Sequence, residues 1–560
     1  MKFSEMQYER PDINKANNVF ENLLQKLQNA ERLDDCLAAY AEIDEYGRYV
    51  SSMFRLAFIR NSLDTTDAFY AAEMAYCDEA GPKLQEIKQK ITEALLRSPF
   101  RSELENRWGT LMFDNAELAL KTFAPEIVAD LQEENRLTTE YDNLIASAQI
   151  EFDGKVLTLA QIGPYRESSD RNVRKASAIA VSNWFIERAD KLDTLFDSLV
   201  ATRTRIAQKL GHDNFTKIGY YRMQRNCYTS DDVAKFREGV VKYIVPLAAR
   251  LKAGQADRIG VETLTPYDDP FQYPDGNPAP IGTPEEIFAH GKKMYAELSN
   301  ETAEFFNFML ENQLFDVLTR PGKAAGGYCE DIPLHKSPFI FANFNGTSGD
   351  IDVLTHEAGH AYAAYMARDI YPSALQNYSS ETAEVHSMAM EFFAWPWMDG
   401  FFGSQTAKYY EYHLAAAITF IPYGTAVDEF QHIIYDNPGM TPKERNALWL
   451  TLEAKYRPWL VPDGIDFYEQ GRRWQAQPHI YENPFYYIDY CLAQIVALAF
   501  WAEAQANHDT AWEKYRRFVS FAGTKTFLEL VTDSGLPTPF ATENLKIVSD
   551  AAVKWLDDRN

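Results

Sequence analysis

Two histidines and a glutamate lie within five consecutive residues, in the segment HEAGH at positions 356–360. Side chains four positions apart on a helix lie one turn above each other, so His356 and His360 can direct two imidazoles at one point. Glu357 projects beside them, toward the place where a bound water would lie. Imidazole pairs of this kind hold zinc, and a carboxylate next to the ion can take a proton from water. The segment therefore predicts one Zn²⁺ ion per chain, with His356 and His360 as ligands and Glu357 as general base.

A zinc ion that activates water needs a third protein ligand and an open fourth position. Three carboxylates follow on the next predicted helix, Glu381, Glu384 and Glu391. We favour Glu384, 24 positions after His360. Spacing alone does not separate the three, because positions 384 and 391 lie two turns apart on one face. A metal-bound histidine usually donates its other ring proton to an acceptor, and Glu391 and Asp352 are the candidates for that contact.

The neighbouring residues predict the elements that hold this segment. The run SPFIFANF at 337–344 is rich in aromatic and β-branched residues and predicts a short strand, followed by a turn at 345–349. Helix-forming residues then predict one helix over 351–368 and a second over 381–394. The two helices can pack antiparallel and share a site.

Apolar residues recur at helical spacing through most of the amino-terminal half. Helices are predicted near the amino terminus, on the stripe of Val19, Phe20, Leu23, Leu24 and Leu27, and over 33–60, 68–97, 102–122, 124–152 and 171–210. Six prolines between 260 and 284 predict a long loop. Thr283 and Glu286 then form a capping-box pattern that predicts a helix start.

Composition limits the classes of function. At 560 residues, the chain is long enough for two or more subdomains. Its 55 basic and 81 acidic residues give a net charge of −26, which argues against nucleic acid as a partner. We expect a cytoplasmic protein with no membrane partner, because no signal-peptide pattern opens the sequence and the best apolar run, 492–501, is too short to span a bilayer. The five cysteines show no C-x-x-C spacing, which predicts buried, reduced thiols.

Three separated blocks resemble the oligoendopeptidase F and thimet oligopeptidase family of zinc peptidases, nearest its bacterial oligoendopeptidase and Pz-peptidase branch. The blocks are GTSGDIDVLTHEAGHAY at 346–362, SSETAEVHSMAMEFF at 379–393 and PHIYENPFYYIDYCLAQ at 478–494. The resemblance implies that His356, His360 and Glu384 are the zinc ligands and that Glu357 is the base. It thereby selects Glu384 over its two neighbours. Ala358 replaces the Phe usual in the family, at a position that is not a ligand.

The third block resembles the family's histidine and paired tyrosines opposite the metal. It implies that His479, Tyr487 and Tyr490 face the substrate, with Tyr490 and His479 donating hydrogen bonds to the developing oxyanion. The spacing after His479 is one residue shorter than in the animal enzymes, so Tyr486 is an alternative to Tyr487. His335 and His386 are given no role.

The resemblance also implies the fold and the substrate. The expected fold is mainly α, a two-lobed helical metallopeptidase with a deep channel and a small β-sheet beside the zinc helix. We expect an amino-terminal helical lobe over 1–200 and a catalytic lobe over 201–560. A deep channel would restrict substrates to short unstructured peptides. The strand at 339–344 is expected to pair with an extended peptide.

The sequence thus predicts a zinc endopeptidase that hydrolyses internal bonds of short peptides. Two alternatives remain. A related zinc carboxypeptidase would require a free carboxyl terminus on its substrate, and a non-catalytic peptide-binding scaffold would have no need of Glu357. The sequence leaves the oligomeric state and the cleavage preference open.

Overall fold

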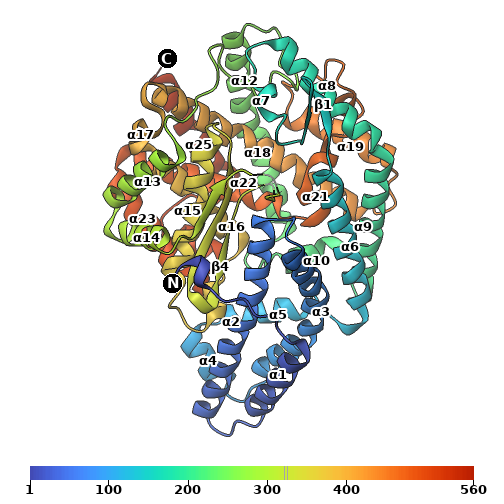
Figure 1. Cartoon of the computed structure of the whole chain (residues 1–560), viewed down its shortest axis with the longest axis vertical. Coiled ribbons are helices and arrows are strands. Elements are labelled where there is room, and N and C mark those ends of the chain that lie inside the picture. The colour runs from blue at the N-terminus through green and yellow to red at the C-terminus, as the bar shows by residue number, and fades with distance from the viewer. Residues whose placement is uncertain (321, 325, 560) are drawn as a thin grey trace. The chain divides into compact units, whose positions relative to one another are not determined.

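The computed structural model describes residues 1–320, 322–324 and 326–559, and most of these residues are in α-helices (Figure 1). By mutual packing the chain divides into two units, each assembled from three segments. The first unit contains residues 1–125, 280–403 and 503–535, and the second contains 126–279, 404–502 and the remaining described residues from 536. The prediction of a mainly α fold with a small sheet is confirmed. The predicted division into lobes 1–200 and 201–560 stays a prediction.

The first unit carries the segment HEAGH. Its helices are α1 (Ile13–Gln28), α2 (Leu33–Leu63), α3 (Ala68–Leu96), α4 (Arg101–Trp108), α5 (Leu111–Leu120), α13 (Pro284–Leu298), α14 (Asn300–Glu311), α15 (Gly349–Ala367), α16 (Ser380–Phe393), α17 (Asp399–Phe402), α23 (His508–Ser520) and α24 (Phe527–Asp533). Helices α1, α2 and α3 pack together (Figure 1). The predicted apolar stripe of α1 is part of their core, with Phe20 and Leu27 buried.

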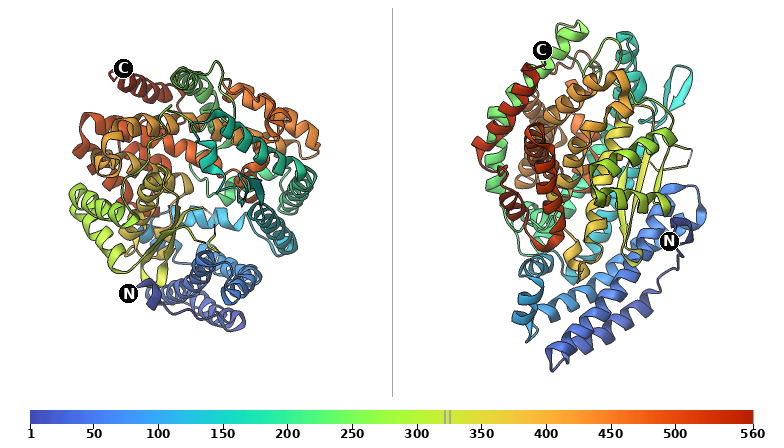
Figure 2. Two further views of the ribbon diagram at one scale, coloured as in Figure 1. Left: turned by 45° about the horizontal axis from the view of Figure 1, so that its top comes forward. Right: turned by 90° about the vertical axis from the view of Figure 1, so that its left-hand side faces the viewer.

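A three-stranded sheet lies beside α15 in the first unit (Figure 2). Its strands are β3 (Phe315–Leu318), β4 (Tyr328–Ile332) and β5 (Ser337–Phe344), in the order β3-β5-β4. Strand β5 pairs parallel with β3 and antiparallel with β4. The strand predicted over 337–344 is confirmed. Its predicted pairing with a peptide is wrong, because β5 is the central strand and both its edges are already hydrogen-bonded.

The second unit carries the block that contains His479. Its helices are α6 (Val128–Ala146), α7 (Gly163–Arg166), α8 (Arg171–Glu187), α9 (Ala189–Lys209), α10 (Phe215–Arg222), α11 (Ser230–Gly239), α12 (Val245–Ile259), α18 (Thr406–Asp436), α19 (Pro442–Tyr456), α20 (Asp466–Glu469), α21 (Pro478–Glu482), most of α22 (Tyr487–Ala506) and α25 (Thr542–Asp557). A hairpin of β1 (Ile150–Phe152) and β2 (Lys155–Leu157) completes it.

A buried arginine ties four helices of the second unit together. Arg203 on α9 donates to Glu134 on α6 at 2.7 Å and to the hydroxyl of Tyr435 on α18 at 2.9 Å. It also donates to the backbone carbonyl of Tyr481 on α21. A buried guanidinium needs acceptors for its donors, and here they come from separate helices. Arg203 therefore fixes α21, the helix that contains His479, against the rest of this unit.

Several predicted helix boundaries are wrong, for local reasons. The helix predicted over 102–122 is two helices, because Gly109 adopts φ +85° and ends α4. The helix predicted over 124–152 ends at Ala146, and β1 follows. Asp153 and Gly154 both have positive φ and form the hairpin turn between β1 and β2. The helix predicted over 171–210 is divided between α8 and α9 at Arg188.

Other predictions agree with the structure. Thr283 and Glu286 form a capping box at the start of α13, after a loop without α-helix or β-strand over the described residues 260–283. All five cysteines are thiols outside any disulfide, with three buried and two, Cys227 and Cys329, half-buried. Within the described ranges, no helix combines the length and apolar character needed to cross a membrane.

Candidate metal centre

Helix α15 begins at a turn that its own first residues hold in place. The carboxylate of Asp350 accepts hydrogen bonds from the backbone N–H groups of Asn345 and Gly346, both at 2.8 Å. An acidic group at a helix amino terminus also interacts favourably with the positive end of the helix dipole. This contact joins the end of β5 to the start of α15, and it sets the helix that carries His356 and His360 relative to the sheet.

Helix α16 packs closely against α15 at a glycine. A Cβ atom on Gly359 would lie 2.5 Å from the backbone oxygen of His386 and 2.6 Å from the Cα of Ser387. No side chain fits at that distance, so only glycine allows the two backbones to approach this closely. The close approach brings Glu384 on α16 within reach of both histidines on α15.

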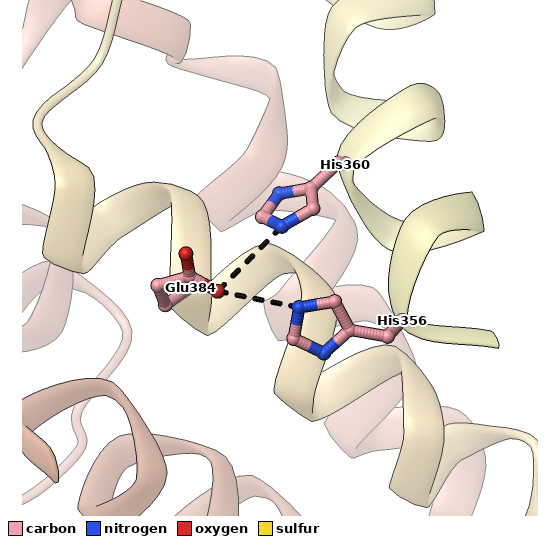
Figure 3. A group of neighbouring side chains, drawn as sticks. All are labelled: His356, His360 and Glu384. Carbon is pink, nitrogen blue, oxygen red and sulfur yellow. Dashed lines mark ion pairs between the residues drawn. The ribbon is translucent and has the colours of Figure 1, made fainter. Parts of the chain in front are cut away.

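The three side chains predicted as ligands meet at one point (Figure 3). One oxygen of Glu384, Oε2, lies 3.4 Å from Nε2 of His356 and 3.5 Å from Nε2 of His360. The three candidate ligand atoms all lie within 4.8 Å of one another. Glu384 is buried and the two histidines are half-buried. The group contains two nitrogens and one carboxylate oxygen, a donor set found in catalytic zinc sites.

The separations fit a metal better than direct hydrogen bonds. Hydrogen bonds from N–H to oxygen are ordinarily 2.7 to 3.2 Å long. Ligands at about 2.0 to 2.1 Å from a tetrahedral zinc lie roughly 3.3 Å apart. The observed 3.4 and 3.5 Å match the second arrangement. The residues present therefore fit a zinc ion.

Electrostatics at this point favour positive charge. Burial lowers the pKa of the His356 imidazole, but the carboxylates of Glu384 and Glu391 outweigh burial and raise that pKa well above its usual value. Burial raises the pKa of the Glu384 carboxyl, and the two histidines outweigh it and lower that pKa below its usual range. A cation between these side chains would satisfy the same attraction.

Two further contacts orient the candidate ligands. Nδ1 of His356 lies 2.7 Å from Oε1 of Glu391, as expected for a carboxylate that fixes a metal-bound histidine. The hydroxyl of Ser387 lies 3.0 Å from Oε2 of Glu384 and donates toward it. Sequence reasoning missed Ser387, although its position three residues after Glu384 on a helix could have indicated the contact.

Glu357 lies next to this group with one oxygen unused. It is 7% exposed, and its Oε2 atom is buried without a hydrogen-bond partner among the described residues. Burial raises the pKa of the Glu357 carboxyl, against the opposing effect of the two histidines. A buried carboxylate oxygen without a donor is costly, and a water molecule could supply that donor. Glu357 is therefore suited to accept a proton.

Other candidates lie on the same two helices. Glu381 is buried on α16, and Asp352 is half-buried in the first turn of α15. His386 is buried with its ring against Tyr378 and Phe518, which is a packing position. The assignment of Asp352 as a support stays a prediction.

The histidine and tyrosines of the third block form a cluster of their own in the second unit. The ring of His479 on α21 lies 4.9 Å from that of Tyr487 and 5.7 Å from those of Tyr490 and Tyr486. All four side chains are half-buried. The structure therefore brings these four residues together. Which of Tyr486 and Tyr487 faces a substrate stays open, because both contact His479.

Comparisons with known proteins agree with the mainly helical fold. Residues 3–123 match the model of the peptidase M3 N-terminal domain, and residues 289–549 match that of peptidase family M3. The solved structure of Pz peptidase A with inhibitor 2 is 47% identical to this chain, with 100% of this chain and 99% of that one covered and a TM-score of 0.96.

The chain belongs to peptidase family M3. The family membership makes it a peptidase, whose substrates are peptides. More distant M3 relatives include group B oligopeptidase PepB of Streptococcus agalactiae, 22% identical over 96% of this chain and 92% of that protein. An oligoendopeptidase F homolog of Borreliella burgdorferi is 27% identical over 251 residues, which are 43% of this chain and 41% of that protein.

Gly359 gives a direct test of how the M3 site is positioned. We expect Gly359→Ala to push α16 away from α15, because the new Cβ would collide with the backbone at His386. The variant should lose at least about tenfold in zinc affinity, measured by competition with a chromogenic chelator. It should also lose about 1 to 3 kcal/mol of stability from overpacking.

Gly47→Ala is the matched control. Gly47 lies within α2, and a Cβ there would have no atom within 4 Å. It should leave zinc affinity unchanged and raise stability slightly, by about 0.5 to 1 kcal/mol. Equal zinc affinity in the two variants would contradict the role given to Gly359.

Proposed function

We propose that this M3 peptidase is a zinc-dependent endopeptidase that hydrolyses internal bonds of short unstructured peptides. The observation that carries the proposal is the position of one Glu384 oxygen, 3.4 Å and 3.5 Å from the Nε2 atoms of His356 and His360. These three residues would hold the ion. A zinc ion held there would polarise the scissile carbonyl and lower the pKa of the attacking water.

Glu357 is proposed as the general base. Its unpartnered Oε2 can take a proton from the attacking water and later deliver it to the leaving amine. Burial, which raises the pKa of this carboxyl, helps it to hold the proton between the two steps. Glu391 and Ser387 would keep His356 and Glu384 in position throughout.

An extended peptide is proposed to add to the outer edge of β4. Among the described strands, β4 pairs with β5 alone, so alternate backbone groups point away from the sheet. A Cβ on Gly327, just before β4, would lie 3.8 Å from Oε1 of Glu357. A peptide along this edge would pass the proposed base, and backbone pairing would tolerate many sequences.

The resemblance to the family supports roles for the second unit's cluster. We propose that Tyr490 and His479 donate hydrogen bonds to the carbonyl oxygen as negative charge develops on it. Such a contact forms mainly in the transition state, so it accelerates the reaction more than it tightens substrate binding. Tyr487 is proposed to line the same substrate-facing surface.

Replacing the base tests the proposed mechanism. We expect Glu357→Gln to lower kcat/KM by at least about 10²-fold while zinc content stays at one ion per chain, because the amide cannot take the proton. The assay uses internally quenched peptides of graded length, with and without a chelator, and product masses identify the bonds that are cut. Glu304→Gln, at an exposed position on α14, is the control and should be fully active.

The same assay separates the alternatives. Products cut at internal bonds, and cleavage that continues when the carboxyl terminus is amidated, would exclude a carboxypeptidase. Zinc-loaded protein that binds every peptide but cleaves none would favour the scaffold. Cleavage that survives either the chelator or Glu357→Gln would contradict the mechanism.

Tyr490 is tested by removing a single hydroxyl. We expect Tyr490→Phe to lower kcat by about 10²-fold with a change in KM of less than about threefold, because the hydroxyl acts on the transition state. Tyr243→Phe is the control, since the hydroxyl of Tyr243 donates to Glu543 at 2.7 Å elsewhere in the same unit. A rise in KM at constant kcat would show that Tyr490 only binds the substrate.

A further inference from the structure

Arg473 is a charged side chain of the second unit that the proposed reaction does not use. It begins the 3-10 helix η8 (Arg473–Ala476), six residues before His479. Its guanidinium carbon lies 5.1 Å from the centre of the Tyr423 ring on α18. The side chain is half-buried, and its Nη1 atom is buried without a hydrogen-bond acceptor in the part of the chain that the structure describes.

Neighbouring arginines differ from Arg473 because carboxylates neutralise them. Arg457 lies over the same Tyr423 ring at 5.4 Å and pairs with Asp269 at 3.0 Å. Arg472, adjacent in sequence, pairs with Asp193 at 2.9 Å. Among the described residues, no carboxylate oxygen lies within 4.0 Å of the Arg473 guanidinium, the longest separation of an ion pair.

Among the described residues, the charge of Arg473 therefore lacks an ion-pair partner. Glu453 attracts it through space but is paired with Arg457 at 3.3 Å. An arginine stays protonated in a protein, and a buried donor without an acceptor is unfavourable. The chain has 81 acidic residues for 55 basic ones, so carboxylates that could have filled this place are plentiful. An anion from outside the chain would neutralise this charge at the part of the half-buried side chain that is open to solvent.

The position of Arg473 within the second unit indicates where such an anion would come from. The ring of Tyr423, which it covers, lies 5.9 Å from the ring of Tyr487. The Tyr423 hydroxyl donates to Oε1 of Gln477 at 2.9 Å, and Nε2 of Gln477 lies 3.0 Å from Nδ1 of His479. One ring and one amide thus separate Arg473 from residues proposed to face the peptide.

We propose that Arg473 binds a carboxylate of the peptide substrate. This inference rests on the proposed function, since it needs a peptide at the His479 cluster. A guanidinium placed over an aromatic ring can still bind a carboxylate with two parallel hydrogen bonds. The carboxylate is either the carboxyl terminus of the peptide or an Asp or Glu side chain. Both offer the two oxygens that the paired N–H groups of a guanidinium bind.

Three peptides of one length distinguish the two sources. The first has neutral residues and a free carboxyl terminus, the second is its amide, and the third is the amide with glutamate scanned through internal positions. In the zinc-loaded protein we expect KM for one carboxylate form to be at least about tenfold lower than KM for the neutral amide. The ratio of KM for the neutral amide to KM for that carboxylate form should fall to about one in Arg473→Gln.

Arg472→Gln is the matched control, because it removes the same charge one residue away from a side chain that is already paired. Its ratio should equal that of the unmodified protein. Equal KM values for all three peptides in the unmodified protein would overturn the inference. So would an equal loss of the ratio in Arg472→Gln and Arg473→Gln, which would indicate general electrostatic attraction.

Two further measurements keep the test decisive. If circular dichroism shows that Arg473→Gln does not fold, Arg473→Lys replaces it. Lysine retains the charge but loses the paired N–H groups of the guanidinium, so the KM ratio should fall at least about threefold. An unchanged ratio would contradict the inference. Dissociation constants of the same peptides in Glu357→Gln, measured by fluorescence anisotropy, report binding without turnover. Failure of the proposed function would abolish cleavage of every peptide, whereas failure of the Arg473 inference would leave cleavage intact and remove the carboxylate preference.

Discussion

The contact between α15 and α16 at Gly359 is the constraint on which the candidate metal centre depends. Two helices whose backbones meet this closely leave no space for a side chain between them. The contact lets one oxygen of Glu384 lie almost equally far from two imidazoles. Those imidazoles share a helix face only because their positions differ by four. A displacement of one helix along the other would separate the carboxylate from both.

The rest of the first unit holds these two helices in place. The turn at Asp350 joins α15 to the central strand of the sheet, and β4 runs beside Glu357. Glu391 and Ser387, both on α16, each contact a candidate ligand. Positions set by packed helices and by hydrogen bonds cost no reorganisation when a cation binds, which is the condition for a rigid catalytic site. In the second unit, the helix that contains His479 is held by similar means, because Arg203 donates to the Tyr481 carbonyl and fixes α21.

The sequence predicts the local parts of this arrangement well. The spacing of His356 and His360 follows from helix geometry, and the strand over 337–344 and both site helices agree with the structure within one or two residues. Glu384 needed the family resemblance, because Glu381 and Glu391 lie on the same helix and only tertiary packing separates them. The peptide-pairing role of β5 was wrong because strand order depends on partners distant in sequence.

Other differences also come from interactions that periodicity does not report. The turn at Asp153 and Gly154 was hidden inside an apparently helical stretch, although that dipeptide is a known hairpin signal. The tight packing at Gly359 depends on the backbone of another helix. An unpartnered guanidinium such as Arg473 becomes visible only once every neighbouring carboxylate has been placed.

His356, His360 and Glu384 are proposed to hold one zinc ion. This ligand set can be located by anomalous diffraction on both sides of the zinc absorption edge. The crystals would contain protein that was purified without added metal and then supplied with one equivalent of zinc. We expect a single anomalous peak about 2.0 to 2.2 Å from Nε2 of both histidines and from a Glu384 oxygen. A peak at other residues, or none at these three, would contradict it.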